Sequence, residues 1–257
     1  MMLPIEQLLL LCAAFFVVSA LYASVGFGGG SSYLALLALF VGSFFAIRSI
    51  ALICNLVVVS GSTYLYIKGG HAKWRHFLPF VLTSVPLAFL GATFRLKEQM
   101  FFIVLGLALI GSALSLFWQT FASAQADRVR PYPRTLPYVL GTGIGFLSGL
   151  VGIGGGIFLA PVLNHLKWGR AVVIAALASF FILVNSLAGL GGLVWAGTLE
   201  LPWVETACLA VTVFVGGQLG VRISLKRFSA TAIKRITAIL VLLVGLRVLL
   251  VHGLQWF

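Results

Sequence analysis

The chain has 257 residues, of which 61% are hydrophobic and only 9% are charged, and its mean hydropathy is +1.14. These values exclude an ordinary water-soluble domain, because a soluble core could not bury so much apolar side chain. The formal net charge of +12 would suggest nucleic-acid binding in a soluble protein. Here the basic residues lie between apolar runs, where membrane orientation accounts for them, and no nucleic-acid partner is expected.

Long uncharged runs cover residues 7–47, 49–67, 99–126 and 171–199. About 20 apolar residues suffice for a helix to cross a bilayer, whereas an outer-membrane barrel would show strands of about ten residues with alternating polarity. The runs therefore predict an all-α, polytopic helical membrane protein. The first seven residues carry Glu6 and no basic residue, so the first run is expected to be retained rather than cleaved as a secretory signal.

Taken in chain order, the apolar segments fall into two groups of five separated by a polar, proline-broken loop. The first group predicts helices over 7–25, 31–46, 49–67, 76–94 and 99–119. The second group predicts helices over 136–150, 157–166, 171–196, 203–221 and 235–252. We therefore expect a first repeat at 1–119, a linker at 120–135 and a second repeat at 136–257.

The sequence VGFGGG at 25–30 recurs as VGIGGG at 151–156, which indicates an internal duplication. Consecutive glycines cost about 1 kcal/mol each inside a helix, so each stretch interrupts the first helical pair of its half. The chain either reverses there, giving ten segments, or only kinks, giving eight spans. Reversal is favoured, because Lys and Arg in the loops then divide thirteen to three between the two sides rather than ten to six.

Five segments per half is an odd number, so the halves are expected to insert as inverted repeats, with glycine-broken re-entrant or V-shaped helix pairs and both termini outside. Broken backbone at membrane depth is tolerated only where protein or a water-filled cavity satisfies it. The helices expected to begin near Ser31 and Ile157 have free N–H groups and about half a positive charge at their starts. Two such starts predict a small-anion site between them.

The glycine stretches and the serines after the first one supply the candidate substrate-binding residues, and the first half-site is expected to be the more polar. These residues are Gly26, Gly28, Gly29, Gly30, Ser31, Ser32, Gly152, Gly154, Gly155 and Gly156. The alternative is that the glycines only permit close helix packing.

Other polar residues inside the apolar segments are costly unless they are paired or face a cavity. Asn55, Ser179 and Asn185 are therefore further candidates for substrate binding, with helix-to-helix hydrogen bonding as the alternative. Arg48 and Arg170 stand at segment starts, where they either attract an anion or, as we favour, anchor the chain at the interface. No metal, cofactor or catalytic motif is found, so an enzyme is not expected.

The stretch Gly26–Gly30 and the segment Gly149-Leu-Val-Gly-Ile-Gly-Gly-Gly-Ile-Phe-Leu-Ala-Pro161 resemble the TauE/SafE sulfite exporter family of membrane proteins. The resemblance implies transport of sulfur-containing anions such as sulfite, sulfoacetate or other organosulfonates, often as export from the cytoplasm. Ser31-Ser32-Tyr33 departs from the family pattern, where an apolar residue is common after the glycines, and this leaves the substrate open.

The expected function is therefore an exporter of small sulfur-containing anions working by alternating access, with an anion channel or a non-transporting scaffold subunit as alternatives. The expected location is the cell membrane, which is the inner membrane in a Gram-negative cell. The expected partners are a small anionic substrate and the lipid bilayer, and a homodimer is left open.

Overall fold

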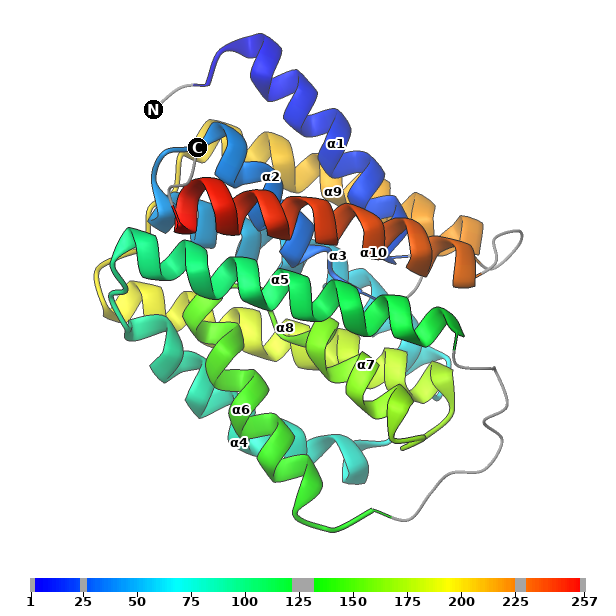
Figure 1. The fold of residues 1–257 in the computed structure, drawn as a ribbon. Coiled ribbons are helices and arrows are strands. Elements are labelled where there is room, and N and C mark those ends of the chain that lie inside the picture. The colour runs from blue at the N-terminus through cyan, green and yellow to red at the C-terminus, as the bar shows by residue number, and fades with distance from the viewer. Residues whose placement is uncertain (1–2, 24–26, 122–131, 225–229, 255–257) are drawn as a thin grey trace.

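The computed structural model describes residues 3–23, 27–121, 132–224 and 230–254 (Figure 1). Its elements are all helical within these ranges, which confirms the all-α prediction. The first half contains α1 (Ile5–Ala23), α2 (Gly30–Phe40), α3 (Phe44–Lys68), α4 (Trp74–Thr93) and α5 (Glu98–Phe121). The second half contains α6 (Leu136–Val151), α7 (Gly156–His165), α8 (Ala171–Trp195), α9 (Trp203–Ser224) and α10 (Ala230–Arg247), which continues as a π-helix over Val248–Gly253.

Among the described residues, six helices are long and apolar enough to cross a bilayer, namely α1, α3, α4, α8 and the first 18 residues of α5 and of α9. The helices α2, α6 and α7 are apolar but shorter. Many large apolar side chains are exposed on the faces of the long helices, for example Leu9 on α1, Leu82 on α4 and Trp195 on α8. A bilayer is the environment in which such a surface is stable, and the polytopic prediction is confirmed.

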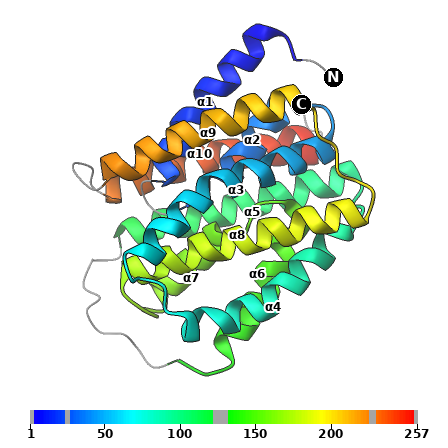
Figure 2. The ribbon, with the colours of Figure 1, turned by 180° about the vertical axis from the view of Figure 1, so that it is seen from behind.

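The chain reverses at both glycine stretches. Leu3 before α1 and Val41 after α2 line one pocket, so the start of α1 and the end of α2 lie at the same end of the bundle. The rings of Tyr132 before α6 and Trp168 after α7 likewise lie against each other, with ring centroids 5.8 Å apart. In Figures 1 and 2, α2 returns toward the N-terminus from the middle of the bundle. The ten-segment alternative is therefore the one that the chain adopts.

The helices of the two halves contact one another in corresponding pairs. We match α1 to α5 in order with α6 to α10. Under this matching, the contact of α1 with α9 corresponds to the contact of α6 with α4. The contact of α3 with α9 corresponds in the same way to the contact of α8 with α4. The pairs α3 with α8 and α5 with α10 map onto themselves. This is the pattern of an approximate twofold relation between halves. The repeat boundaries and the inverted insertion of the halves in a bilayer stay predictions.

The two closest helix pairs are held by glycines. On α6, Gly141, Gly145 and Gly149 face the backbone of α4, and a methyl group added at Gly149 would lie 1.9 Å from the Ala88 carbonyl oxygen. On α9, a methyl group at Gly220 would lie 2.1 Å from the carbonyl oxygen of α1's Ala20. Small residues let membrane helices approach closely. Close packing thus explains these glycines, whereas those at the starts of α2 and α7 have a different geometry.

The ends of the bundle differ in charge. One end, which we call the acidic end, is formed by the start of α1 and by residues 41–43, 94–97 and 196–202. There Arg95 donates a hydrogen bond to the Ala196 carbonyl. The opposite end, which we call the basic end, has residues 69–73, 132–135 and 166–170. Its basic residues include Lys68, Lys73, Arg75, Arg134, Lys167, Arg170 and Arg222, whereas Glu6, Glu98, Glu200 and Glu205 lie toward the acidic end.

Candidate functional site

Both short helices begin at a glycine in the left-handed region. The N-cap of α2 is Gly29, with φ of 87°, and the N-cap of α7 is Gly155, with φ of 82°. Side chains rarely adopt this conformation, which explains the requirement for glycine. Neither N-cap supplies a side-chain hydrogen bond. The first N–H groups of each helix therefore have no capping side chain, and the positive end of each helix dipole is directed toward the glycine stretch.

The two glycine stretches converge on the side chain of Asn55, in the middle of α3. Its amide nitrogen donates a hydrogen bond to the Ile153 carbonyl, with an N···O distance of 2.9 Å. A methyl group at Gly30 would lie 2.3 Å from that nitrogen, and one at Gly154 would lie 3.1 Å from it. A methyl group at Gly28 would lie 2.6 Å from the Asn55 carbonyl oxygen. The structure thus brings together both helix starts and Asn55, while Gly26 lies outside the described residues.

Several buried polar atoms around these helix starts have no hydrogen-bond partner. They include the Asn55 carbonyl oxygen and the hydroxyls of Ser148 and Ser186. A methyl group at Gly154 would lie 3.1 Å from the Ser186 hydroxyl, and one at Gly155 would lie 3.2 Å from the Ser148 Cβ. Burying a polar group without a partner costs free energy, typically about 1–3 kcal/mol, so such atoms are characteristic of a site that a ligand or water completes.

The serines of the first glycine stretch already have partners. The Tyr22 hydroxyl lies 2.8 Å from the Ser32 hydroxyl and 3.5 Å from that of Ser31. All three residues are buried. The first half-site therefore offers a cluster of hydroxyls held together by α1, and the second offers the two serine hydroxyls without partners. Tyr22 was not singled out from sequence, although a tyrosine at the end of an apolar helix beside a glycine stretch is a signal for it.

The second-half candidates on α8, Ser179 and Asn185, are not among the nearest neighbours of the described glycines in either stretch, whereas Asn55 is. Asn185 is buried and donates through its amide nitrogen to the Phe181 carbonyl of the preceding turn, at 2.9 Å. Its neighbour Ser186 is the residue whose hydroxyl approaches Gly154. Ser179 is also buried, about two helical turns earlier. Ser186 is thus the polar α8 side chain that lies against the second glycine stretch, beside the apolar Phe181 and Ile182.

A small cavity lies between the helix starts. It is lined by Tyr22, Phe27, Gly28, Gly29, Gly30, Ser31, Asn55, Ile153, Ile157 and Ile182. A water-sized sphere can occupy about 10 Å³ inside it, which is room for about one water molecule. The isoleucines and Phe27 that surround it are at most 4% exposed. The candidate site is therefore closed in this conformation, and a sulfite-sized anion requires the helix starts to separate.

Arg48 corrects one expectation from sequence. It does not stand at the start of its segment, because Ser43 accepts a hydrogen bond from the Ala46 amide and α3 already begins at Phe44. Its side chain is 0% exposed, so it is not an interfacial anchor. One terminal nitrogen donates to the Gly149 carbonyl at 2.9 Å and to the Ala92 carbonyl at 3.3 Å, at the C-terminal ends of α6 and α4.

The remaining donors of Arg48 are free. Its Nε and Nη1 atoms are buried without a hydrogen-bond partner, and its Cβ would lie 3.4 Å from a methyl group at Gly152. Arg48 lies about two helical turns before Asn55 on α3, and therefore on nearly the same face of the helix. A buried positive charge thus borders the second glycine stretch. Arg170, in contrast, is exposed at the N-terminus of α8 on the basic end, where an interfacial position was expected.

The site contains hydrogen-bond donors and no described carboxylate. The described acids lie toward the acidic end, and no group of three or more His, Cys, Asp or Glu suited to a metal ion occurs among the described residues. Converging helix N-termini, buried hydroxyls and a buried guanidinium all favour negative charge. The arrangement is chemically suited to bind a small anion.

Comparison with known proteins decides the family. Residues 11–248 match the family described as Sulfite exporter TauE/SafE. The chain belongs to this family. It is similar to "Probable membrane transporter protein y4hK" of Sinorhizobium fredii (strain NBRC 101917 / NGR234), with 36% identity over 93% of the chain and 97% of the relative. No solved structure matches the chain significantly.

A second relative is more distant. "Probable membrane transporter protein YunE" of Bacillus subtilis (strain 168) is 27% identical over 71% of the chain and 72% of the relative. Membership of the TauE/SafE family makes the chain a membrane transporter rather than an enzyme. The family match spans both glycine stretches, so the duplicated glycine-capped helices lie within the part of the chain that defines membership.

Proposed function

We propose that the chain exports small sulfur-containing oxyanions, such as sulfite or an organosulfonate, by alternating access. The anion binds between the starts of α2 and α7. The single observation that carries this proposal is the convergence of two uncapped helix N-termini on Asn55 inside the bundle. Such termini bind anions through free N–H groups and the helix dipole. The description of the TauE/SafE family supplies the sulfur-containing substrate class.

The oxyanion would complete the unsatisfied groups of the site. The hydroxyls of Ser148 and Ser186 can each donate one hydrogen bond, and a pyramidal or tetrahedral oxyanion presents three oxygens as acceptors. Arg48 supplies the positive charge that offsets the cost of moving an anion into a low-dielectric interior. The Asn55 carbonyl oxygen would be satisfied by a protonated anion such as bisulfite or by a water molecule carried with it.

Charge asymmetry supports an orientation for the transporter. Lys and Arg accumulate in cytoplasmic loops of membrane proteins, which supports an orientation with the basic end in the cytoplasm and both termini outside. At the basic end, Trp168 is 5% exposed and packs edge-on against Phe80 and His76, with ring centroids 5.6 and 6.2 Å apart, and we propose that it closes the path to the anion site. Access from the cytoplasm would then require Trp168 to move away from α4.

The closed cavity favours a transporter over an anion channel. A channel needs a continuous water-filled path, whereas the space between the helix starts here holds about one water molecule. Sites near the bilayer midplane that open to one side at a time are typical of secondary transporters built from repeats. A scaffold role has no specific observation in its favour.

The test is flux in liposomes that contain the purified full chain. Radiolabelled sulfite, sulfoacetate, sulfate and chloride are compared at equal concentration, with protein-free liposomes as the control for leakage. Saturable flux of sulfite or sulfoacetate, with competition by the unlabelled anion, is expected. Saturation separates a transporter from a channel, since channel flux rises nearly linearly over the same range. Chloride flux alone, or no flux of any anion above the leak, contradicts the proposal.

A further inference from the structure

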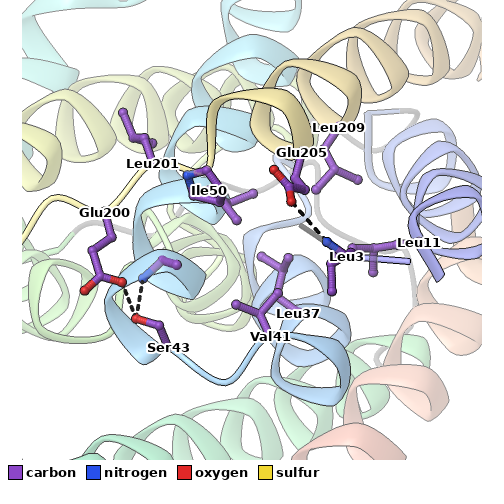
Figure 3. Close-up of a pocket in the computed structure, with 12 residues that line it drawn as sticks. Leu3, Leu11, Leu37, Val41, Ser43, Ile50, Glu200, Leu201, Glu205 and Leu209 are labelled. Atoms are coloured by element: carbon purple, nitrogen blue, oxygen red, sulfur yellow. Dashed lines mark hydrogen bonds between the residues drawn. The ribbon is translucent and has the colours of Figure 1, made fainter. Parts of the chain in front are cut away.

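A second, larger cavity lies at the acidic end, apart from the glycine-capped site. Figure 3 shows its lining, which is drawn from α1, α2, α3, α9 and the segment between α8 and α9. A water-sized sphere can occupy about 290 Å³ inside it, close to the lower limit of about 300 Å³ that is usual for small-molecule pockets. We call it the acidic-end pocket. Its lining residues are Leu3, Leu11, Leu37, Val41, Ser43, Ala46, Ile50, Glu200, Leu201, Pro202, Glu205 and Leu209.

The lining of the acidic-end pocket is apolar except for two carboxylates and one hydroxyl. Leu11, Leu37 and Leu209 are fully buried, so they form its inner end. Glu205 is only 6% exposed, whereas Glu200 is exposed at the mouth. A buried carboxylate beside an apolar inner wall is the arrangement that binds a ligand with one charged and one apolar part.

The charge of Glu205 is offset in part by one backbone hydrogen bond and by the N-terminal end of α9. Its Oε1 atom accepts a hydrogen bond from the Leu3 amide at 3.2 Å, and neither carboxylate forms an ion pair within the described part of the chain. Glu200 accepts a hydrogen bond from the Ser43 hydroxyl at the N-terminus of α3, where the helix dipole partly offsets its charge. Glu205 lies in the first turn of α9, and its carboxylate is presented to the pocket (Figure 3).

Helix ends of both signs line the acidic-end pocket. Leu37 and Val41, at the end of α2, line the acidic-end pocket, so the C-terminus of that helix lies against it. A helix C-terminus carries about half a negative charge and favours a cation. The same short helix therefore starts at the anion site and ends at this pocket. The N-terminal ends of α3 and α9 also line the pocket and carry partial positive charge, but the two full carboxylate charges outweigh these partial charges. The pocket therefore favours a positively charged occupant.

The size and lining decide the kind of cation. A bare Ca²⁺ or Mg²⁺ ion requires about six oxygen ligands at short range, and no metal-binding group of acids and histidines occurs among the described residues. We propose that the acidic-end pocket binds an organic cation, with its ammonium group against Glu205 and a compact apolar body against the leucines. This site is separate from the anion site and does not depend on the transport proposal.

The test is calorimetric titration of the full chain in lipid nanodiscs. The probe is 2-phenylethylammonium, and 2-phenylethanol is the neutral probe with the same body. The ammonium should bind saturably, and at least about tenfold more tightly than the alcohol. Glu205→Gln should weaken the ammonium by about tenfold or more and leave the alcohol unchanged. Glu98→Gln is the matched control, because Glu98 is exposed at the same end and does not line the pocket.

A second variant keeps the proposal testable if Glu205→Gln does not fold. Val41→Trp places an indole in the acidic-end pocket from a half-buried position and should abolish binding of the ammonium. Equal affinities for the two probes, no saturable binding of the ammonium, or unchanged binding in a folded Glu205→Gln chain would each overturn the proposal. Absence of anion flux in liposomes bears on the transport proposal alone, because this assay measures binding of a cation.

Discussion

The side-chain amide of Asn55 donates a hydrogen bond to the backbone carbonyl of Ile153, 98 positions later in the chain. This bond joins α3 of the first half to the glycine stretch of the second, at the point where the starts of α2 and α7 converge. Asn55 is fully buried, and its carbonyl oxygen has no partner.

We expect Asn55→Asp to abolish anion flux while the chain stays folded. The replacement has nearly the same shape, but it removes the amide donor and can place a negative charge between two helix N-termini that otherwise favour an anion. Flux of the transported anion into liposomes is the measurement, with elution volume and circular dichroism as checks of folding. Asn164→Asp is the matched control, since Asn164 lies near the end of α7 outside the site. Equal flux in both variants would remove Asn55 from the site.

Arg48 should determine affinity for the anion through its charge. We expect Arg48→Gln to raise KM for the anion by about tenfold or more and Arg48→Lys to raise it less, since a buried counter-charge typically contributes about 2 kcal/mol or more. A role confined to holding the ends of α4 and α6 predicts a loss of stability with KM unchanged. Arg170→Gln is the control, because Arg170 is exposed on the basic end, and its KM should match that of the unmodified chain.

Trp168 should control access from the basic end. We expect Trp168→Ala to increase the labelling rate of a cysteine at position 186, in a Ser186→Cys background without other cysteines, when a small charged thiol reagent is applied from that end. The reason is that Trp168 fills the space against Phe80 and Tyr132. Trp118→Ala is the control, since Trp118 is 71% exposed at the same end. Identical labelling rates in both variants would mean that Trp168 does not close the path.

Gly149 should be required for stability rather than for anion binding. A methyl group there meets the Ala88 carbonyl at 1.9 Å, so Gly149→Ala should force α4 and α6 apart and lower the free energy of unfolding by about 1–3 kcal/mol. Gly143→Ala is the matched control on the same helix, because nothing lies within 4 Å of its added methyl group. It should be neutral or stabilising by about 1 kcal/mol. Unfolding in detergent, followed by circular dichroism, measures both variants, and equal stability would contradict the packing account.

The helices were predictable from sequence to within a few residues in most cases, because continuous apolar runs can form only helices in a bilayer. The main error was at residues 41–48. Apolar periodicity continues across Val41 and Phe44, so the run appeared to be one helix to residue 46. Ser43 is the N-cap of α3, and this signal would have moved the helix start to Phe44 and placed Arg48 inside the bundle.

The candidate site was predictable where backbone conformation determines it. Glycine stretches repeated in both halves indicated the helix starts, and a polar residue in a fully apolar run indicated Asn55. Side-chain direction was not predictable, because adjacent helical residues point about 100° apart. This is why Ser186 rather than Asn185 approaches Gly154. Tyr22 reaches Ser31 and Ser32 across the reversal of the chain, and no sequence spacing encodes that distance.

The helix contacts of one half correspond to those of the other half. This correspondence has a consequence for the relative populations of conformations open at one end or at the other. Suppose that the conformation open at the basic end and the one open at the acidic end contain the same helix pairs, with the two halves interchanged. These two conformations would then differ in free energy only because some residues differ between the two halves. The segment after α7 contains the buried Trp168, whereas residues 41–43, which follow α2, contain no aromatic side chain. About 1.4 kcal/mol changes such a ratio of populations tenfold, so in that case one or two substitutions outside the site would be enough to change which conformation predominates.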